Sequence, residues 1–293
     1  METKMEESGG EPKTLLKLLA DADGLLRQAG APTPRLDAEI LLCHALGCER
    51  AWLFTHMNDV APEGIAEKYS AMVSRREKRE PVAYIRGFKE FYSLTFRVAP
   101  EALIPRPETE LIIDEAFRLF PAESEINALD IGAGSGAIAV TLAYHRPGWA
   151  IDAVDISPGA LALACSNALS HEVGRRINFQ LSDLYEAIGD KRYNLIVSNP
   201  PYIPEESAEV APDVTKFEPH KALFAGDGGL AIIKRIIKNA PAHLEENGKL
   251  ILEIGFGQAD EVERLVKETG ALRILKMTPD YAGITRTVVA EPI

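Results

Sequence analysis

The sequence lacks any apolar run approaching the roughly 20 residues that a membrane-spanning helix needs. Residues 1–12 are acidic and contain glycine, so they have neither the basic start nor the apolar stretch of a signal or transit peptide. We therefore expect no membrane partner, a cytoplasmic location and a flexible tail over residues 1–12.

Cysteine is also scarce. Cys43, Cys48 and Cys165 are the only three cysteines, and they form neither an even disulfide framework nor a metal-ligand spacing. Cys43 and Cys48 lie within one apolar helix pattern, which favours buried thiols, so we expect no metal site. By contrast, 46% of the 293 residues are hydrophobic, which is enough for real cores and allows two domains.

Basic residues are outnumbered, because 32 Lys and Arg face 44 Asp and Glu for a net charge of −12. Residues 1–98 hold 14 of the basic and 15 of the acidic residues, so almost all of the acidic excess follows residue 98. Nonspecific binding to nucleic acid needs a basic surface. The one local basic run, residues 75–79, is interpreted as a solvated helix face. We expect no direct nucleic-acid partner.

Residues 13–86 have the spacing of helices. Apolar residues recur at helical intervals over three segments. These segments are 14–29, 35–46 and 65–78. Trp52, Leu53 and Phe54 are expected to pack between them. Because this part contains no convincing catalytic set, we predict a small helical bundle that docks a substrate.

Residues 87–107 indicate a different element. Apolar and polar residues alternate over 88–98, on either side of a turn at Tyr92-Ser93, which is the pattern of a β-hairpin. Two prolines then lock an extended segment before a helix expected over 108–120. Arg106, between those prolines, fits a structural ion pair and a ligand contact equally well. We expect this hairpin linker to join the bundle to a domain over residues 108–293.

From residue 108 onward, strand-like and helix-like segments alternate. Buried strands are expected over 126–131, 149–154, 177–181, 193–197 and 250–254. Helices are expected over 136–144, 158–169, 229–240 and 259–268. This alternation predicts an α/β fold with a doubly wound, Rossmann-like sheet. The last two strands, 272–277 and 285–290, are too close for a crossover, so the final strand should be antiparallel.

A glycine-rich turn, Gly132-Ala133-Gly134-Ser135-Gly136, follows the first of these strands and opens a helix. Glycines permit positive φ angles and bring backbone N–H groups close to a ligand at the helix N-terminus, where a carboxylate is stabilised. The turn also satisfies a loose fingerprint of NAD-binding proteins, so by itself it does not identify the cofactor.

Acidic residues follow the next two strands. Asp155 lies 23 residues after Gly132, where a carboxylate can accept hydrogen bonds from both ribose hydroxyls. Asp183 is placed to accept from an adenine amino group, with Leu184 against the ring. Each acid alone is more often a cap or turn residue, but together, opposite a glycine turn, they favour a nucleoside ligand.

The stretch Asn199-Pro200-Pro201-Tyr202 comes where the fourth strand should end. The two prolines cannot continue a sheet, and the proline after Asn199 holds that residue extended, so the loop is stiff. The Asn199 amide oxygen and a proline-flanked carbonyl can accept both N–H bonds of a planar NH2 group, while the Tyr202 ring packs on its face. A plain Pro-Pro turn is the structural alternative.

Together the two sites indicate an enzyme that transfers a methyl group from S-adenosyl-L-methionine to nitrogen. An amide nitrogen is a poor nucleophile, and no histidine or lysine near the loop looks like a general base. Positioning must therefore dominate: acceptors that anchor both N–H groups aim the nitrogen in line with the methyl. Attraction between the cation and an aromatic face adds about 1 kcal/mol.

Several strings in the chain closely resemble the PrmC/HemK family, the N5-glutamine methyltransferases of peptide chain release factors. They are 87–98, 104–110, 130–136, Asp155, 199–202, 218–219, 224–229, 253–255 and 283–286. The resemblance implies a seven-stranded class I methyltransferase sheet. It also implies methylation of the glutamine in the Gly-Gly-Gln motif of release factors, which affects translation termination, with the helical domain helping to dock them.

The resemblance also assigns roles to residues. Residues 132–136, Asp155, Asp183, Leu184 and Asn199 would contact the cofactor. Residues 199–202 would hold the glutamine amide, with Asn199, Pro200 and Tyr202 as the catalytic set. Two positions depart from the family pattern: Ala133 replaces the usual threonine, and Leu184 stands where some members have an aromatic residue, so cofactor affinity can differ.

Three alternatives stay open. A sister enzyme that methylates a large-subunit ribosomal protein shares the catalytic loop, but it usually departs from the string at residues 105–110. Adenine-N6 and guanine-N2 nucleic-acid methyltransferases use the same loop type, but they are expected to need a basic groove or a target-reading domain. A noncatalytic binding protein would not need the intact loop. We expect a monomer whose partner is a release factor.

Overall fold

The structure of the protein is a computed structural model that describes residues 13–207 and 211–293. The tail expected over residues 1–12 lies outside the described residues. The chain divides into two compact units at the junction between Arg86 and Gly87.

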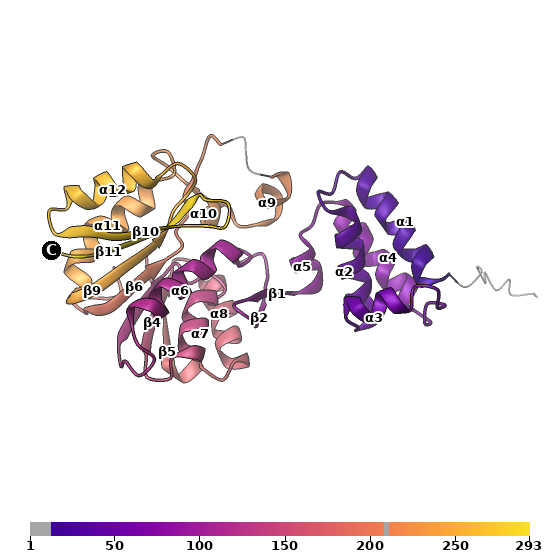
Figure 1. Ribbon diagram of the computed structural model, residues 1–293, viewed down its shortest axis with the longest axis horizontal. Helices are drawn as coiled ribbons and strands as arrows, with labels where there is room; N and C mark the ends of the chain where they lie inside the picture. Colours follow the sequence, from indigo (N-terminus) through magenta and orange to yellow (C-terminus); the bar gives the residue numbers. More distant parts are fainter. Residues whose placement is uncertain (1–12, 208–210) are drawn as a thin grey trace, which may run out of the picture. The chain divides into compact units, whose positions relative to one another are not determined.

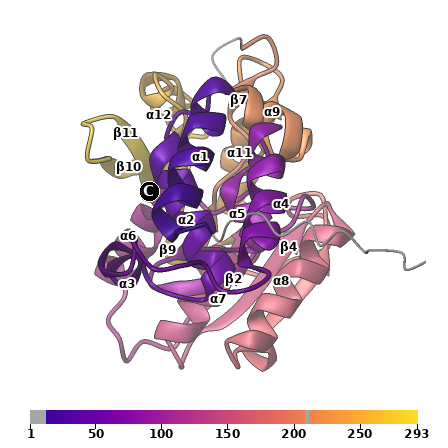
Figure 2. The same ribbon diagram turned by 90° about the vertical axis from the view of Figure 1, so that its right-hand side faces the viewer.

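The N-terminal unit is a bundle of helices. They are α1 (Leu15–Gln28), α2 (Pro34–Leu46), α3 (Arg50–Thr55), α4 (Ile65–Glu77) and α5 (Val82–Arg86). Thr14 caps α1 by accepting a hydrogen bond from the Lys17 N–H, and Gly47 ends α2 in the left-handed conformation. Helices α1, α2 and α4 pack side by side around buried leucines (Figures 1 and 2).

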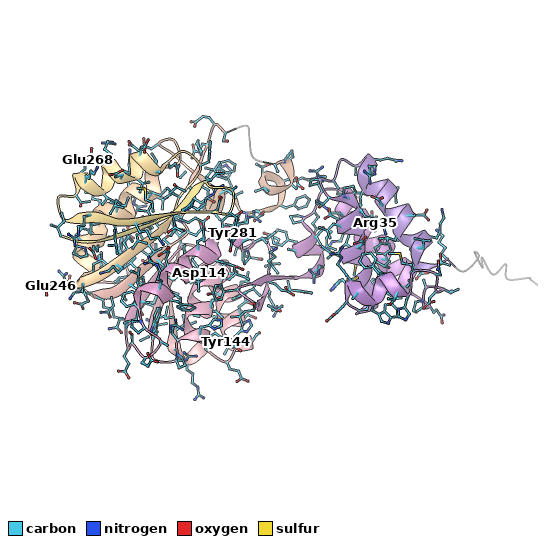
Figure 3. The ribbon with its side chains drawn as sticks, in the orientation of Figure 1. Arg35, Asp114, Tyr144, Glu246, Glu268 and Tyr281 are labelled. Atoms are coloured by element: carbon cyan, nitrogen blue, oxygen red, sulfur yellow. The ribbon has the colours of Figure 1, made fainter. Side chains whose placement is uncertain are left out.

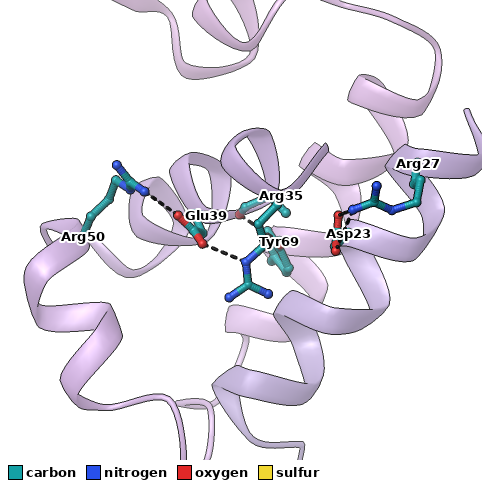
Figure 4. Close-up of polar contacts among 7 residues, drawn as sticks. Asp23, Arg27, Arg35, Glu39, Arg50 and Tyr69 are labelled. Atoms are coloured by element: carbon teal, nitrogen blue, oxygen red, sulfur yellow. Dashed lines mark hydrogen bonds and ion pairs between the residues drawn. The ribbon is translucent and has the colours of Figure 1, made fainter. Parts of the chain in front are cut away.

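Polar contacts join these helices as well (Figure 4). Glu39 on α2 accepts hydrogen bonds from Arg35, one turn earlier, and from Arg50 on α3. Tyr69 on α4 donates its hydroxyl to the buried carbonyl of Ala38 on α2. These side chains hold α2, α3 and α4 together.

Two expectations about this unit are wrong in part. Of the residues expected to pack between the helices, only Leu53 is buried, whereas Trp52 and Phe54 are 41% and 49% exposed. Within the basic run at residues 75–79, Arg76 is buried rather than solvated, because it forms an ion pair with Asp37 at 2.7 Å. That pair also accounts for an arginine on the inner face of α4.

The second unit begins with a hairpin where the alternation predicts one. Its first elements are β1 (Phe88–Phe91), β2 (Leu94–Arg97), the 3₁₀ helix η1 (Pro107–Thr109) and α6 (Glu110–Leu119). Phe91 and Phe96 bury the inner side of the hairpin. At its turn, Tyr92 donates its hydroxyl to Asp114 on α6, a residue labelled in Figure 3. The hairpin is thereby fixed to the helix that follows it.

A seven-stranded sheet forms the centre of this unit. Its strands are β3 (Asn127–Ile131), β4 (Ala150–Asp155), β5 (Ile177–Leu181), β6 (Tyr193–Ser198), β9 (Leu244–Glu253), β10 (Leu272–Pro279) and β11 (Thr285–Pro292). They lie in the order β10-β11-β9-β6-β3-β4-β5. β11 is antiparallel to both of its neighbours, whereas β9, β6, β3, β4 and β5 pair in parallel. The predicted antiparallel final strand is confirmed.

Helices cover both faces of this sheet (Figure 1). α6, α7 (Ala137–His145) and α8 (Pro158–Ser170) pack on one face, and α11 (Ala231–His243) and α12 (Ala259–Glu268) pack on the other. Along β6, Leu195 and Val197 enter the first core while Ile196 enters the second. Burial on both faces explains why the central strands are continuous apolar runs in the sequence. The predicted doubly wound α/β fold is confirmed.

Several short elements were not predicted. η2 (Gly174–Arg176) leads into β5, and four more lie between β6 and α11. Those four are β7 (Ile203–Pro204), α9 (Pro212–Phe217), α10 (His220–Leu223) and β8 (Phe224–Ala225). β7 pairs in parallel with β8, although the two are far apart in the chain. The chain that follows the loop at residues 199–202 therefore returns to lie beside β7.

The expectation of buried thiols is correct for only one of the three cysteines. Cys43 is buried, but Cys48 and Cys165 are only half-buried. No helix in the described part of the chain is long and apolar enough to cross a membrane. Within residues 13–207 and 211–293, no group of His, Cys, Asp and Glu is arranged to hold a metal ion.

Candidate active site

A cavity of about 690 Å³ opens at the carboxyl ends of β3, β4, β5 and β6. β4 and β5 lie on one side of β3 and β6 lies on the other, so the strand order reverses here, where doubly wound sheets bind their ligands. Ten predicted site residues line the cavity: Gly132, Ala133, Gly134, Ser135, Asp155, Asp183, Leu184, Asn199, Pro200 and Pro201. The other two described candidates, Gly136 and Tyr202, are not part of its lining.

The glycine turn folds tightly against the end of β4. The N–H groups of Gly132 and Ala133 both donate to the Val154 carbonyl, and the Gly134 N–H donates to the Asp155 carboxylate at 2.8 Å. The φ angles are +79° at Gly132 and +55° at Gly134, a region that glycine adopts at no steric cost. The local sequence thus fixes the backbone of the cavity wall.

Gly136 is required for packing between helices. A Cβ atom at this position would lie 3.1 Å from the Ala164 Cβ on α8 and 3.3 Å from the Val140 Cγ2 on α7. Its φ of +81° also disfavours any other residue. Gly136 therefore lets α7 start close to α8 and sets the direction in which that helix leaves the turn.

Asp155 joins the glycine turn to the loop after β4. Its carboxylate accepts hydrogen bonds from the Gly134 N–H and from the Ser157 N–H, each at 2.8 Å. Burial raises its pKa, while the backbone N–H groups act in the opposite direction. A carboxylate has about four lone-pair positions, so acceptor capacity remains for a ligand.

Asp183 and Leu184 follow β5. Asp183 forms an ion pair with Arg235 on α11 at 2.9 Å, and both side chains are partly exposed. Leu184 adopts a positive φ of +53°, and its carbonyl accepts a hydrogen bond from the Ser182 hydroxyl. The Arg235 partner was not predicted, and it occupies part of the acceptor capacity of Asp183.

The Asn-Pro-Pro-Tyr loop is held from several sides. Ser198, the last residue of β6, donates its hydroxyl to a carbonyl on β3 at 2.6 Å. Gln258, just before α12, donates Nε2 to the Tyr202 carbonyl at 3.0 Å. Gly229 passes so close that a Cβ there would collide with the same carbonyl oxygen, so only glycine fits. The loop is therefore fixed by its surroundings as well as by its prolines.

A buried carboxylate lies behind this loop. Glu253, the last residue of β9, is 1% exposed and accepts hydrogen bonds from two hydroxyls. Thr109 donates to its Oε2 at 2.7 Å, and Tyr202 donates to its Oε1 at 3.0 Å. Thr109 Oγ1 in turn accepts from the Asn199 amide nitrogen at 2.9 Å. Both ends of the loop are thus connected through Glu253.

Two acidic side chains beneath the site have strongly shifted pKa values. Burial raises the pKa of Glu253 to about 7, although its two hydroxyl donors act in the opposite direction. Burial also raises the pKa of Asp130, on β3, to about 7, and the Asp155 charge adds to this shift. The Ala139 N–H donates to Asp130 Oδ2, while Oδ1 has no hydrogen-bond partner among the described residues.

The position of Arg106 is compatible with both a structural ion pair and a ligand contact. It forms an ion pair at 2.5 Å with Glu218, which is 5% exposed, and it also lines the cavity. Glu218 accepts a second hydrogen bond from the Ile104 N–H at 3.0 Å. The segment before α10 is thereby tied to the proline-flanked segment before α6.

Sequence reasoning missed the partners of the predicted site residues. Glu253 and Thr109 are 144 positions apart, and Arg106 and Glu218 are 112 apart, so no local pattern relates them. One signal was available for Glu253. A carboxylate at the end of an apolar strand needs hydrogen-bond partners if it is buried, and that requirement points to an unseen network.

The fold and the site define an S-adenosyl-L-methionine-dependent methyltransferase. The family model described as the methyltransferase small domain matches residues 112–217. The solved catalytic domain of hMettl16, in complex with MAT2A 3'UTR hairpin 1, aligns with a TM-score of 0.55 and 17% identity, covering 78% of this chain and 81% of that one. A methyltransferase from Pyrococcus furiosus aligns with a TM-score of 0.51 and 15% identity, covering 76% and 96%. At such identities these structures support the fold alone.

Relatives in sequence are far closer. A protein named release factor glutamine methyltransferase from Koribacter versatilis is 42% identical, covering 91% of this chain and 94% of the relative. A protein of the same name from Geobacter sulfurreducens is 43% identical, covering 94% and 95%. The PrmC N-terminal domain model matches residues 17–87. The chain belongs to the release factor glutamine methyltransferase family, as its resemblance to PrmC/HemK predicts.

Proposed function

We propose that this chain transfers a methyl group from S-adenosyl-L-methionine to the side-chain nitrogen N5 of the glutamine in the Gly-Gly-Gln motif of release factors. The observation that carries the proposal is the position of Asn199 and the hydrogen bond that its side chain makes. This residue lines the cavity close to the glycine turn, and its Nδ2 is engaged by Thr109, so its Oδ1 is the atom that it can present to a substrate N–H. Family membership supports the same reaction.

The residues around the cavity fit the cofactor. Asp155 keeps lone pairs for the ribose hydroxyls, because its two backbone donors occupy only part of its acceptor capacity. Asp183 and Leu184 are at the end of β5, where an adenine would lie. The turn at residues 132–135 stands before the N-terminus of α7, which suits a carboxylate. Ala133 offers backbone only, and Asn199 closes the cofactor site on the side of the acceptor.

The chain's own residues act mainly by positioning. When bound, S-adenosyl-L-methionine supplies an electrophilic methyl group on a sulfonium sulfur. Asn199 Oδ1 and the Pro200 carbonyl accept the two N–H bonds of the glutamine amide, and the ring of Pro201 keeps both acceptors stiff. This arrangement aims the nitrogen at the methyl, and the amide proton leaves to solvent during or after transfer.

We propose a role for Tyr202 other than that of a stacking surface for the substrate amide, which its sequence suggests. Its ring packs against the core on the α11 and α12 face, and its hydroxyl is engaged by Glu253. Since Tyr202 is not part of the cavity lining, we assign it to fixing the loop that carries Asn199 and Pro200. It thereby serves the reaction through its neighbours.

A protein acceptor is favoured over a nucleic acid. The acidic excess lies after residue 98, in the unit that contains the cavity, and it would repel a phosphate backbone. Residues 13–86 then serve to dock the release factor. The string at residues 105–110 favours release factors over a ribosomal protein, and an intact loop argues against a noncatalytic role. We expect a monomer that works in the cytoplasm, where release factors act.

The proposal is tested by incubating the protein with cofactor labelled in its methyl group and with three acceptors in parallel: a release factor, a large-subunit ribosomal fraction, and RNA with DNA. We expect label on the release factor, and mass spectrometry should place a single methyl on the glutamine of Gly-Gly-Gln. If only nucleic acid or only a ribosomal protein is labelled, the proposed release-factor substrate is wrong. If none of the three acceptors is labelled, the result supports a noncatalytic binding protein.

A further inference from the structure

We infer that Glu253 is a positioning residue that sets which way the Asn199 side-chain amide faces, acting through the Thr109 hydroxyl. This inference rests on the proposed function, because it concerns the acceptor that Asn199 offers to the glutamine amide. It adds a group that touches neither the cofactor nor the substrate. Its basis is the direction of the hydrogen bonds that lie behind the loop.

The first step concerns Thr109, whose hydroxyl has one proton to donate. In the structure Thr109 Oγ1 lies 2.7 Å from Glu253 Oε2 and 2.9 Å from Asn199 Nδ2. An ionised carboxylate only accepts hydrogen bonds, so the Thr109 proton points toward Glu253. The lone pairs of Oγ1 are then directed to Asn199, and they select the NH2 end of its amide.

The second step concerns the substrate side. With the NH2 end of Asn199 held by Thr109, the carbonyl end Oδ1 is directed to the acceptor site, where it can accept an N–H of glutamine. The reversed amide would set the Asn199 NH2 group against the glutamine NH2 group. The glutamine N–H that Oδ1 accepts in the proposed mechanism would then have no acceptor. Glu253 also accepts from Tyr202 at 3.0 Å, so the same carboxylate holds the far end of the loop.

The third step is a dependence on pH. Burial raises the pKa of Glu253 to about 7, so the carboxylate gains a proton in an accessible range. The other charged groups that face it are Glu108, whose charge raises this pKa, and Arg286 on β11, whose charge lowers it. Arg286 is itself paired with Asp280 at 3.1 Å. When Glu253 carries its proton on Oε2, it donates to Thr109 Oγ1 instead of accepting from it. The Thr109 proton is then free to point to Asn199 Oδ1, which reverses the amide.

The chain offers a matched control. Thr287 on β11 is the cross-strand neighbour of Glu253 and is fully buried. Its hydroxyl has no hydrogen-bond partner in the part of the chain that the structure describes. Thr109→Val and Thr287→Val each replace a hydroxyl by a methyl group. The first change is at the residue that donates to Glu253, and the second is at its cross-strand neighbour. Only the first change interrupts the connection to Asn199.

The experiment measures release-factor methylation by the full chain and its variants from about pH 6 to pH 9, with cofactor affinity and melting temperature alongside. Thr109→Val should lower kcat/KM by about 10- to 100-fold, with cofactor affinity within about threefold of the wild type, because the acceptor nitrogen is misaligned. Thr109→Ser restores the hydroxyl and should restore activity, and Thr287→Val should stay within about threefold of the wild type.

The wild type and Thr109→Ser should lose activity as pH falls through about 7, and Thr109→Val should lack that limb. If the wild type is active but Thr109→Val matches it in rate and profile, the inference is wrong and the proposed function stands. If Thr109→Val does not fold, the wild-type profile decides, because a profile without a limb near pH 7 contradicts the inference. A wild type that methylates no release factor overturns the proposed function and this inference together.

Discussion

Asp155 has a structural role in the fold and, in the proposed function, a second role in binding the cofactor. It fixes the glycine turn through Gly134 and the next loop through Ser157, and it also lines the cavity. We expect Asp155→Ala to weaken cofactor binding by about 10- to 100-fold, since hydrogen bonds to a charged acceptor contribute roughly 1.5 to 3 kcal/mol. Titration calorimetry with S-adenosyl-L-methionine measures this change.

Asp152 provides the control for that measurement. It lies on the same strand, and it accepts hydrogen bonds from the Tyr193 hydroxyl at 2.7 Å and from Lys191 at 3.1 Å, but it does not line the cavity. Asp152→Ala should therefore leave the cofactor dissociation constant unchanged. An unchanged constant in Asp155→Ala as well would remove Asp155 from the cofactor site.

Asp130 should make folding stability depend on pH. Its folded-state pKa of about 7 lies above its ordinary value of 3.8, so its ionisation disfavours the folded state as pH rises between these values. Asp130→Asn keeps an oxygen for the Ala139 N–H without the charge. Relative to the wild type it should gain about 1 kcal/mol or more at pH 8, or roughly 2 to 4 °C in melting temperature.

That gain should disappear near pH 4, where Asp130 is protonated in the folded protein. Thermal unfolding of both proteins at pH 4, 6 and 8 measures the difference. A constant difference across the three pH values would mean that Asp130 is not held in its uncharged form by burial.

The sequence predicts the place of some site residues but not the contacts of others. Asp155, Asp183 and Asn199 follow strands that are evident from apolar runs, and parallel strands bring their carboxyl ends to one edge, so their grouping could be predicted. Glu253 and Arg235 could not be predicted as partners of the site. Their contacts depend on strand order and on helix packing, which no local pattern contains.

At the scale of elements, the start of α7 depends on close contact with α8. Gly136 lies where a Cβ would approach Ala164 to 3.1 Å, within a backbone whose φ is +81°. Gly136→Ala should lower the free energy of unfolding by about 1 to 3 kcal/mol through overpacking, beyond the cost of the backbone angle. Denaturant unfolding measures this loss.

The variant Gly270→Ala distinguishes the cost of overpacking from the cost of the backbone angle. Gly270 also has a positive φ, of +61°, but a Cβ there would meet nothing within 4 Å. Gly270→Ala therefore carries the backbone cost alone, and Gly136→Ala should exceed it. Equal losses in the two variants would show that packing between α7 and α8 does not require glycine.

Elements were predictable to different degrees for physical reasons. Helix α12 begins and ends where its apolar spacing indicates, at Ala259 and Glu268, because one face is buried and the other is solvated. β9 begins at Leu244, six positions before the expected residue 250, because a strand edge with few apolar residues has no periodic signal. α10, with only four residues, is too short for periodicity to reveal.

At the scale of the whole molecule, the proposed chemistry lies entirely in the unit that starts at Gly87. A chain reduced to residues 87–293 should bind S-adenosyl-L-methionine with near-normal affinity, because every residue that lines the cavity is retained. It should methylate an intact release factor poorly, because residues 13–86 are proposed to dock the factor. Calorimetry and a methylation assay measure the two properties. Normal methylation by the folded shorter chain would contradict the docking role.

The central claim is that Asn199 orients a glutamine amide for methylation. The most direct test is mass spectrometry of a release factor incubated with cofactor and either the wild type, Asn199→Ala or Asn199→Asp. The wild type should add one methyl to the glutamine of Gly-Gly-Gln. Both variants should lose about 10²-fold or more in kcat/KM with near-native melting temperatures, and Asn199→Ala should keep cofactor affinity within a few-fold. Near-normal methylation by either variant would contradict the role of Asn199, and a methyl found on nucleic acid alone would contradict the substrate.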